Sequence, residues 1–378
     1  MNLSNSMSPR FRWLGALFGA LALLAGCAAA PPKPPAPAVM FYPAPPDPPR
    51  IQHLAMFASS RDVGGPRGGF TDFVLGEEGN ENALKRPYGA ALFQGKIYVA
   101  DGKVPGLVVF DLIAQRYSTI EGSGTGKMQR PINVTIDADG TKYVTDTGRD
   151  QVLVYDRDDR FVTAFGAKGE FKPVGTLVVG DRLYVVDIAH HEVQVLDKRS
   201  GKLQFRFGKP GSDEEGALFQ PTNLARGPGG DIYVAETGNF RVSRFTPDGK
   251  FVRRFGEAGQ TPGTFARPKG IAVDRDGRVF VGDAAFQNVQ LFDSSGRVLM
   301  AFGQPADGSQ GLNLPAGIAI DYDNVALFRR FAAPGFNLEY VILVVSQFGP
   351  NQVDVFGFGK MGGVEYPPDP APAAKPGG

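Results

Sequence analysis

The sequence predicts an all-β fold, a six-bladed β-propeller, and three observations lead to this prediction. A similar stretch recurs six times, and the prolines that begin the copies are separated by 44, 42, 48, 47 and 47 residues. Each of the first five copies contains four short runs rich in β-forming residues, and the sixth contains three. Turn-forming Gly, Asp and Pro residues separate the runs, and four strands in about 45 residues are typical of one propeller blade.

The copies share one pattern from the first run to the last. The fifth copy has Arg267-Pro-Lys-Gly-Ile-Ala-Val-Asp, then Arg278-Val-Phe-Val-Gly-Asp283, Val289-Gln-Leu-Phe-Asp293 and Arg297-Val-Leu-Met-Ala-Phe-Gly303. Turns such as Asp274-Arg-Asp-Gly277 supply side-chain hydrogen bonds and positive φ. The prolines that begin the copies are Pro87, Pro131, Pro173, Pro221, Pro268 and Pro315.

Five copies also end their second run with an acidic residue. These acids are Asp101, Asp146, Asp187, Glu236 and Asp283. Their recurrence indicates a shared structural task, bonding to the backbone of the turn that follows. With the basic-Pro start and the closing Phe-Gly, the copies resemble NHL repeats over about residues 86–359, which implies a six-bladed propeller. The sixth copy departs from the pattern, since Ser346 replaces the acid.

The sixth copy lacks a fourth run, and the N-terminal part of the domain supplies a candidate for it. Residues 51–57 alternate like a strand, so we expect them to complete the last blade and residues 58–85 to bridge to the first. This closure would remove exposed sheet edges. The propeller is therefore predicted to span residues 51–360. A seven-bladed ring with a degenerate blade at residues 51–85 is the alternative.

Residues 1–26 have the pattern of a secretory signal peptide. The apolar run of residues 13–24 would rise about 18 Å as a helix, which is short for a hydrocarbon core of about 30 Å. The run ends in Leu24-Ala25-Gly26-Cys27, which resembles the lipobox of bacterial lipoproteins and implies lipidation of Cys27. An ordinary signal peptide with a free thiol and an uncleaved anchor are the alternatives.

Residues 27–50 follow as the lipidated cysteine and a proline-rich linker. Ten prolines fall among residues 28–50, which favours an extended stalk or a ligand for a partner. Residues 361–378 form a proline-rich tail that we expect to be disordered. Together these segments predict a protein held in the cell envelope by a lipid anchor. By resemblance to the sorting rule of enteric bacteria, Ala28 favours the outer membrane over the inner, with the domain facing the periplasm or exterior.

Composition narrows the function classes. The net charge is +1, from 40 basic and 39 acidic residues, so no bulk charge favours nucleic acid. One cysteine excludes disulfides within the chain, and three histidines make a three-histidine metal site possible only if all converge. No nucleotide-binding or hydrolase motif is present. The sequence gives no reason to expect a cofactor, a metal or a catalytic residue, and the domain is expected to be monomeric.

Propellers usually bind ligands at the mouth of the central channel, so the loops there hold the candidate binding residues. They lie before the first run and after the second run of each copy. The candidates are Arg86, Tyr88, Arg130, Asn133, Lys172, His190, Asn223, Arg267 and Lys269. Several basic groups on a near-neutral protein favour an anionic partner, although the basic residues could instead pack between blades.

His190 and His191 are adjacent, but neighbouring side chains on an extended chain point in opposite directions. The pair is therefore expected to face solvent or a partner rather than a metal ion. The resemblance includes lyases that cleave amidated peptide precursors and need converging histidine ligands. His53 lies on the predicted outermost strand, far from the channel, so this chain cannot supply three.

The sixth copy has extra chain between its first two runs, rich in aromatic and arginine residues. Such a composition is typical of interaction hot spots. The candidate partner loop contains Phe328, Arg329, Arg330, Phe331 and Phe336. The same segment could instead fold back to cover the N-terminal junction.

Two functions follow from these expectations. The first is a membrane-anchored scaffold of the cell envelope that binds a protein, peptide or glycan without chemistry. The alternative is a metal-dependent propeller enzyme, a lyase or lactone hydrolase, with its site in the channel. Asn133 and Asn223 are candidate inward ligands for the alternative, but no acid occupies the equivalent positions. The binding module is therefore favoured.

Overall fold

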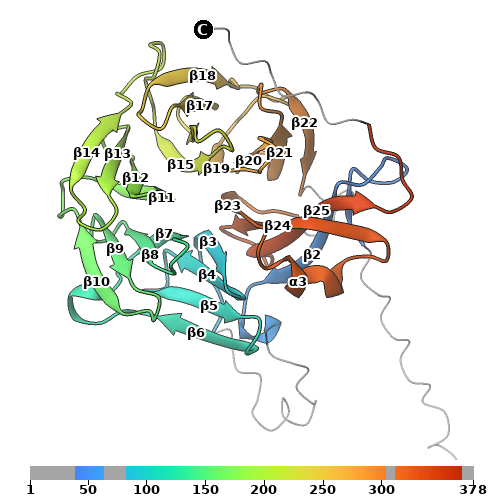
Figure 1. The fold of residues 1–378 in the computed structure, drawn as a ribbon, viewed down its shortest axis with the longest axis horizontal. Coiled ribbons are helices and arrows are strands. Elements are labelled where there is room, and N and C mark those ends of the chain that lie inside the picture. The colour runs from blue at the N-terminus through green and yellow to red at the C-terminus, as the bar shows by residue number, and fades with distance from the viewer. Residues whose placement is uncertain (1–38, 64–81, 304–310, 368–378) are drawn as a thin grey trace, which may run out of the picture. The chain divides into compact units, whose positions relative to one another are not determined.

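The six predicted blades are present in the computed structural model, which describes residues 39–63, 82–303 and 311–367. Five sheets have four antiparallel strands and the sixth has five (Figure 1). The first strands of the blades contact one another in the order β3, β7, β11, β15, β19, β23 and back to β3. This circular order closes the ring, so the prediction of a six-bladed propeller is confirmed.

Each of the first five blades is built from consecutive strands. Blade one contains β3 (Pro87–Phe93), β4 (Lys96–Asp101), β5 (Leu107–Asp111) and β6 (Arg116–Ile120). Blade two contains β7 (Pro131–Ile136), β8 (Lys142–Asp146), β9 (Gln151–Tyr155) and β10 (Phe161–Phe165). Blade three contains β11 (Pro173–Val179), β12 (Arg182–Asp187), β13 (Glu192–Asp197) and β14 (Leu203–Phe207). Blade four contains β15 (Pro221–Arg226), β16 (Ile232–Glu236), β17 (Arg241–Phe245) and β18 (Phe251–Phe255). Blade five contains β19 (Pro268–Val273), β20 (Val279–Asp283), β21 (Asn288–Phe292) and β22 (Val298–Phe302).

Blade six joins the two ends of the domain. It contains β23 (Pro315–Asp321), β24 (Phe336–Ser346), β25 (Val353–Met361), β2 (Ile51–Phe57) and β1 (Phe41–Tyr42). β2 pairs antiparallel with β25, so the N-terminal strand supplies the missing fourth strand as predicted. Beside it, His53 Nε2 lies 2.8 Å from Oδ1 of the buried Asp354.

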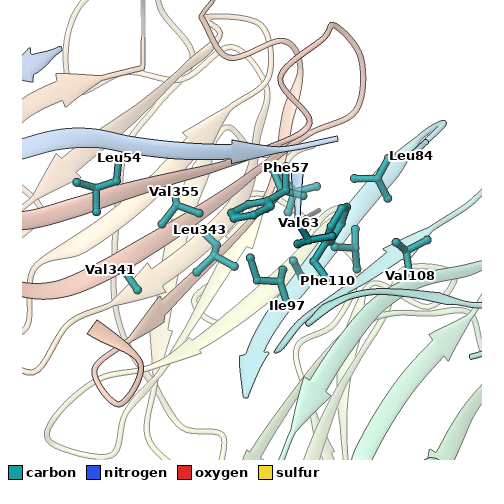
Figure 2. Close-up of a cluster of buried hydrophobic side chains, with 14 of the residues drawn as sticks. Leu54, Phe57, Val63, Leu84, Ile97, Val108, Phe110, Val341, Leu343 and Val355 are labelled. Carbon is teal, nitrogen blue, oxygen red and sulfur yellow. The ribbon is translucent and has the colours of Figure 1, made fainter. Parts of the chain in front are cut away.

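A hydrophobic cluster holds this closing strand against blade one. Leu54 and Phe57 from β2 pack with side chains of β24, β25, β4 and β5 (Figure 2). The rings of Phe57 and Phe110 have centroids 5.6 Å apart. Burying aromatic and branched side chains is the main favourable term in folding, so the contact between the first and last blades stabilises the closed ring.

The insertion of blade six folds back onto the same junction. It forms α3 (Val325–Phe328) and η3 (Arg329–Phe331), and Phe328 is buried in the junction cluster. Gln52 on β2 donates its Nε2 to the Phe331 carbonyl at 3.0 Å and accepts from the Ala333 N–H at 2.9 Å. The segment therefore folds back over the N-terminal junction, which was the second of the two expectations for it. Phe328 and Phe336 are buried, so as partner contacts these two candidates are wrong.

Segments next to the predicted boundaries also have structure. β1 lies within the predicted linker, and Tyr366 in the predicted tail donates its hydroxyl to the Pro49 carbonyl at 2.7 Å. Two further short 3-10 helices are η1 (Ser60–Asp62) and η2 (Gly124–Gly126). The predicted signal peptide and Cys27 lie outside the described residues. In the described part of the chain, no helix has the length and apolar character needed to cross a membrane.

Candidate binding site at the channel mouth

The strand register places the predicted binding loops on one face of the propeller. The first and second strands of each blade are antiparallel. The proline that starts the first strand lies opposite the last residue of the second strand; in blade one, Pro87 lies opposite Asp101. The loop before the first strand and the loop after the second therefore meet at the same end of each blade. We call this end the mouth face.

The repeated acids lie beneath the mouth face and are fully buried. Asp146 accepts hydrogen bonds from the backbone N–H groups of Gln129, Arg130 and Gly148 at 2.6, 2.9 and 2.9 Å. Asp101 and Asp283 bond the equivalent backbone groups of their own blades. Asp187 and Glu236 likewise bond to both mouth loops of their blades. The acids therefore join the two mouth loops of the five blades that carry one, and the prediction of a shared structural task is confirmed.

The basic residues just before the blade prolines use only their backbone in this arrangement. Their N–H groups bond to the acids, and their side chains are exposed. These residues are Arg86, Arg130, Lys172 and Arg267. Within the residues that the structure describes, none of the four side chains forms a salt bridge. Their charges are thus open to a partner.

The two predicted asparagines meet across the ring. Asn133 is the third residue of β7 and Asn223 the third residue of β15. These two strands are separated by β11, and Asn133 Nδ2 donates to Asn223 Oδ1 at 2.8 Å. Asn223 Nδ2 donates to the Lys269 carbonyl at 3.1 Å, and the Val134 N–H donates to Asn133 Oδ1. Each amide is therefore engaged on both its nitrogen and its oxygen.

Glycine at the equivalent position of the other four blades makes this bridge possible. A Cβ on Gly89 would lie 2.5 Å from Asn133 Oδ1, and one on Gly317 would lie 2.5 Å from the Tyr88 carbonyl. Both distances are too short for any larger residue. The equivalent glycines, Gly89, Gly175, Gly270 and Gly317, thus let the inner strands approach closely around the two asparagines.

A second group of predicted residues gathers directly at the mouth. Lys269 on β19 holds its Nζ 5.5 Å from the centre of the Tyr88 ring on β3. Burial and, to a smaller extent, the nearby charges of Arg267 and Arg86 together lower the pKa of Lys269 to about 8. Burial raises the pKa of Tyr88 to about 12, against the opposing effect of Arg267. Three basic residues from blades one and five, Lys269, Arg267 and Arg86, therefore form one cationic cluster around Tyr88.

Two exposed phenylalanines at the mouth face were missed by sequence reasoning. Phe348 has 42% of its surface exposed and lies 5.3 Å below the Arg86 guanidinium. Phe219 has 40% exposed and lies against the His191 ring. Phe348 follows Ser346, which holds the place of the acid, so its loop was identifiable from the repeat pattern. The repeat pattern did not indicate that the ring of Phe348 would be exposed.

His190 lies in a different environment from the cationic cluster. Its Nδ1 lies 2.6 Å from Oδ2 of the buried Asp187, whose hydrogen bond and charge raise the pKa of His190. It lines a groove of about 370 Å³ together with Phe171 and Arg206. The described residues contain no group of three or more His, Cys, Asp or Glu side chains placed to hold a metal ion.

The fold and this mouth define a β-propeller protein, and comparisons with known proteins agree on the fold. Solved structures similar to this chain include a protein of unknown function from Bacteroides thetaiotaomicron. The two share 16% identity and a TM-score of 0.57, over 82% of this chain and 75% of the Bacteroides protein. A gluconolactonase from Xanthomonas campestris has 17% identity and TM-score 0.53 over 86% and 98%. A streptogramin B lyase has 14% identity and TM-score 0.51 over 73% and 84%.

Curated relatives match only part of the chain. The peptidylglycine alpha-amidating monooxygenase of Rattus norvegicus is 36% identical over 123 residues, which are 30% of this chain and 12% of that protein. The Mus musculus protein of that name is 35% identical over the same shares. No protein-family model matches the chain, so its resemblance to NHL repeats stays a prediction.

Proposed function

We propose that this protein is a binding propeller of the cell envelope, anchored through a lipid on Cys27, whose mouth face binds an acidic partner without chemistry. One observation carries the proposal. The mouth face exposes Arg86, Arg130, Lys172 and Arg267, and the described residues offer them no acidic side chain. The acids nearest in the repeat are buried and bonded to backbone N–H groups. An acidic partner would supply the missing charge and be steered toward the face.

The second candidate is a metal-dependent enzyme with its site in the channel. It is favoured by the likeness in fold to a gluconolactonase and a lyase, at 17% and 14% identity. Asn133 and Asn223 are the channel residues it would use. Their amides bond to each other and to backbone groups, so a metal ion would have to displace those bonds.

The test uses the full chain and a fluorescent hexaglutamate peptide, followed by fluorescence anisotropy. Replacing Arg86, Arg130, Lys172 and Arg267 by Ala is expected to weaken binding at least about tenfold, since each exposed charge pair contributes up to about 1 kcal/mol. Wild-type affinity should fall as salt is raised. The matched control replaces four exposed basic residues in or next to the turns between third and fourth strands: Arg116, Arg199, Lys202 and Lys250.

Two outcomes would overturn the proposal. The first is equal loss in both quadruple variants, which would indicate attraction without a site. The second is a stoichiometric divalent ion in the purified protein that is lost in Asn133→Ala with Asn223→Ala, which would favour the enzyme. Anchoring is tested separately with Cys27→Ser, which should move the protein from the membrane fraction to the soluble fraction. Retention in the membrane fraction would contradict the lipid anchor.

A further inference from the structure

We propose that Lys269 is the anchor of the mouth face and binds one carboxylate of an acidic peptide segment, between Tyr88, Arg86 and Arg267. This inference rests on the proposed function, because it names the group recognised at that site. It assigns to Lys269 a task that the exposed basic residues do not share. Three features of the cluster support it: a fixed position, an unbalanced charge and aromatic walls.

The backbone of Lys269 is held firmly at the ring. Its carbonyl accepts hydrogen bonds from Thr222 Oγ1 at 2.9 Å and from Asn223 Nδ2 at 3.1 Å. Lys269 directly follows Pro268, whose ring restricts φ, and lies at the start of β19. Lys269 therefore starts from a fixed point beside the asparagine bridge, and an anchored cation loses less entropy on binding than one on a mobile loop.

The charge of Lys269 is unbalanced. Its side chain is partly buried, yet it forms no salt bridge in the described part of the chain. Its charged neighbours are Arg267 and Arg86, which repel it and lower its pKa. A partly desolvated cation beside two like charges is costly unless an anion joins it. A carboxylate at this point would be attracted by all three side chains.

Aromatic rings next to the cations favour a peptide carboxylate over a free anion. Tyr88 lies under Lys269 Nζ, and Phe348 lies under the Arg86 guanidinium with 42% of its surface exposed. Tyrosine, phenylalanine and arginine together are typical of the centre of protein interfaces. The exposed ring of Phe348 can contact an apolar side chain that flanks an acidic residue, whereas inorganic phosphate would leave this ring exposed.

Binding at Lys269 predicts a dependence on pH. The pKa of Lys269 is about 8 in the free protein, and a bound carboxylate would raise it. Below pH 8 the side chain is already charged, so affinity should be nearly constant there. Between pH 8 and 10 the protein must take up a proton to bind, so affinity should fall as pH rises. The arginines keep their charge throughout this range.

The experiment measures binding of a hexapeptide Phe-Glu-Phe-Glu-Phe-Glu to the full chain at pH 7, 8, 9 and 10. The matched Phe-Gln peptide and inorganic phosphate are separate arms. Lys269→Met is expected to weaken binding of the Glu peptide at pH 7 at least about tenfold and to remove the fall above pH 8. Lys269→Arg should restore binding and keep it flat across the range. Lys250→Met, on the turn after the third strand of blade four, is the control.

The outcomes separate this inference from the proposed function. If Lys269→Met binds like wild type while the quadruple mouth variant does not, the anchor is wrong and the acidic-partner proposal stands. If neither variant changes binding, both are wrong. If phosphate competes with the peptide at equal concentration, or the Gln peptide binds equally well, recognition of a peptide carboxylate is wrong.

Discussion

The buried acids and the exposed basic residues of the mouth face are close in the same repeat, but their charges are satisfied in different ways. Asp146 is fully buried and accepts four backbone hydrogen bonds from the mouth loops. Arg130, whose own N–H is one of those donors, directs its side chain into solvent. The chain thus supplies hydrogen-bond donors to the carboxylate of Asp146, but it supplies no acidic partner to the side chain of Arg130 among the described residues.

This difference helps to separate structural charges from functional ones. Every repeated acid is tied to the loops of its own blade, so its recurrence follows from blade architecture. Basic residues stand at four of the six positions before the blade prolines, yet none of their side chains forms a salt bridge among the described residues. Lys269 differs from both groups, because its charge is partly buried and has no acidic neighbour among the described residues. A charge that costs stability and gains nothing within the fold is a candidate for function.

The largest effect is expected at a buried acid. Asp146→Ala removes the acceptor of several backbone N–H groups and should lower the free energy of unfolding by about 3 kcal/mol. Urea denaturation measures this change. Asp146→Asn keeps one acceptor oxygen and should cost less than the alanine variant. A loss below about 0.5 kcal/mol for Asp146→Ala would contradict the structural task of the acids.

The next effect concerns the asparagine bridge. Asn133→Ala leaves Asn223 Oδ1 without its amide donor, so the free energy of unfolding should fall by about 1 to 2 kcal/mol. Asn337→Ala is the matched control, since Asn337 is exposed on β24 and should change stability little. Thermal and urea unfolding give the two values. Equal effects at both positions would show that the bridge does not stabilise the ring.

Replacing Lys269 is expected to raise the free energy of unfolding, whereas the two preceding substitutions lower it. Lys269→Met should raise stability at pH 7 by roughly 1 kcal/mol, because it removes a partly buried, unpaired charge. The unfolded lysine keeps its proton up to a pKa near ~10.4, whereas the folded one loses it near 8. Between these values the wild type gains stability as pH rises, so the difference between the two proteins should shrink toward pH 10. A difference that grows with pH would refute this account.

The smallest effect is expected at the exposed basic residues. Arg130→Ala and Lys172→Ala should each change the free energy of unfolding by less than about 0.5 kcal/mol, since neither side chain has a partner in the described residues. The same urea denaturation checks this value. A loss as large as that of Asp146→Ala would mean that these side chains pack between blades and are not free for a partner.

Much of the fold could be predicted because the repeat carries local signals. The proline, the turn residues and the alternating runs recur every 42 to 48 residues, so the strands of each blade can be predicted from the local sequence of that blade. The closing strand was predictable too, since residues 51–57 alternate and the sixth copy lacks a fourth run. Where the insertion of blade six packs could not be predicted, because aromatic and arginine residues are typical of a partner surface as well as of a buried junction. Only the packing of Phe328 into the junction showed that the segment folds back, while Arg329, Arg330 and Phe331 are exposed and stay candidate partner contacts.

The candidate site was predicted by position but not by arrangement. Repeat alignment placed Tyr88, Asn133, Asn223 and Lys269 at the mouth end of their strands, where the strand register also puts them, and their binding of a ligand stays a prediction. It could not show that the asparagines bond to each other, or that Lys269 lies over Tyr88 two blades away in the ring. Such pairs join residues 90 and 181 positions apart, and no local pattern specifies which side chains meet across a channel.

By itself the sequence determined the period, the strands, the number of blades and the strand that closes the ring, because these depend on neighbouring residues and on a count. Tertiary structure alone decided which charges are satisfied. Asp146 and Lys269 are both charged residues of one mouth, but the first finds backbone donors and the second only like charges and an aromatic ring. The energy of a charge depends on its burial and on every group around it, and those groups come from separate blades.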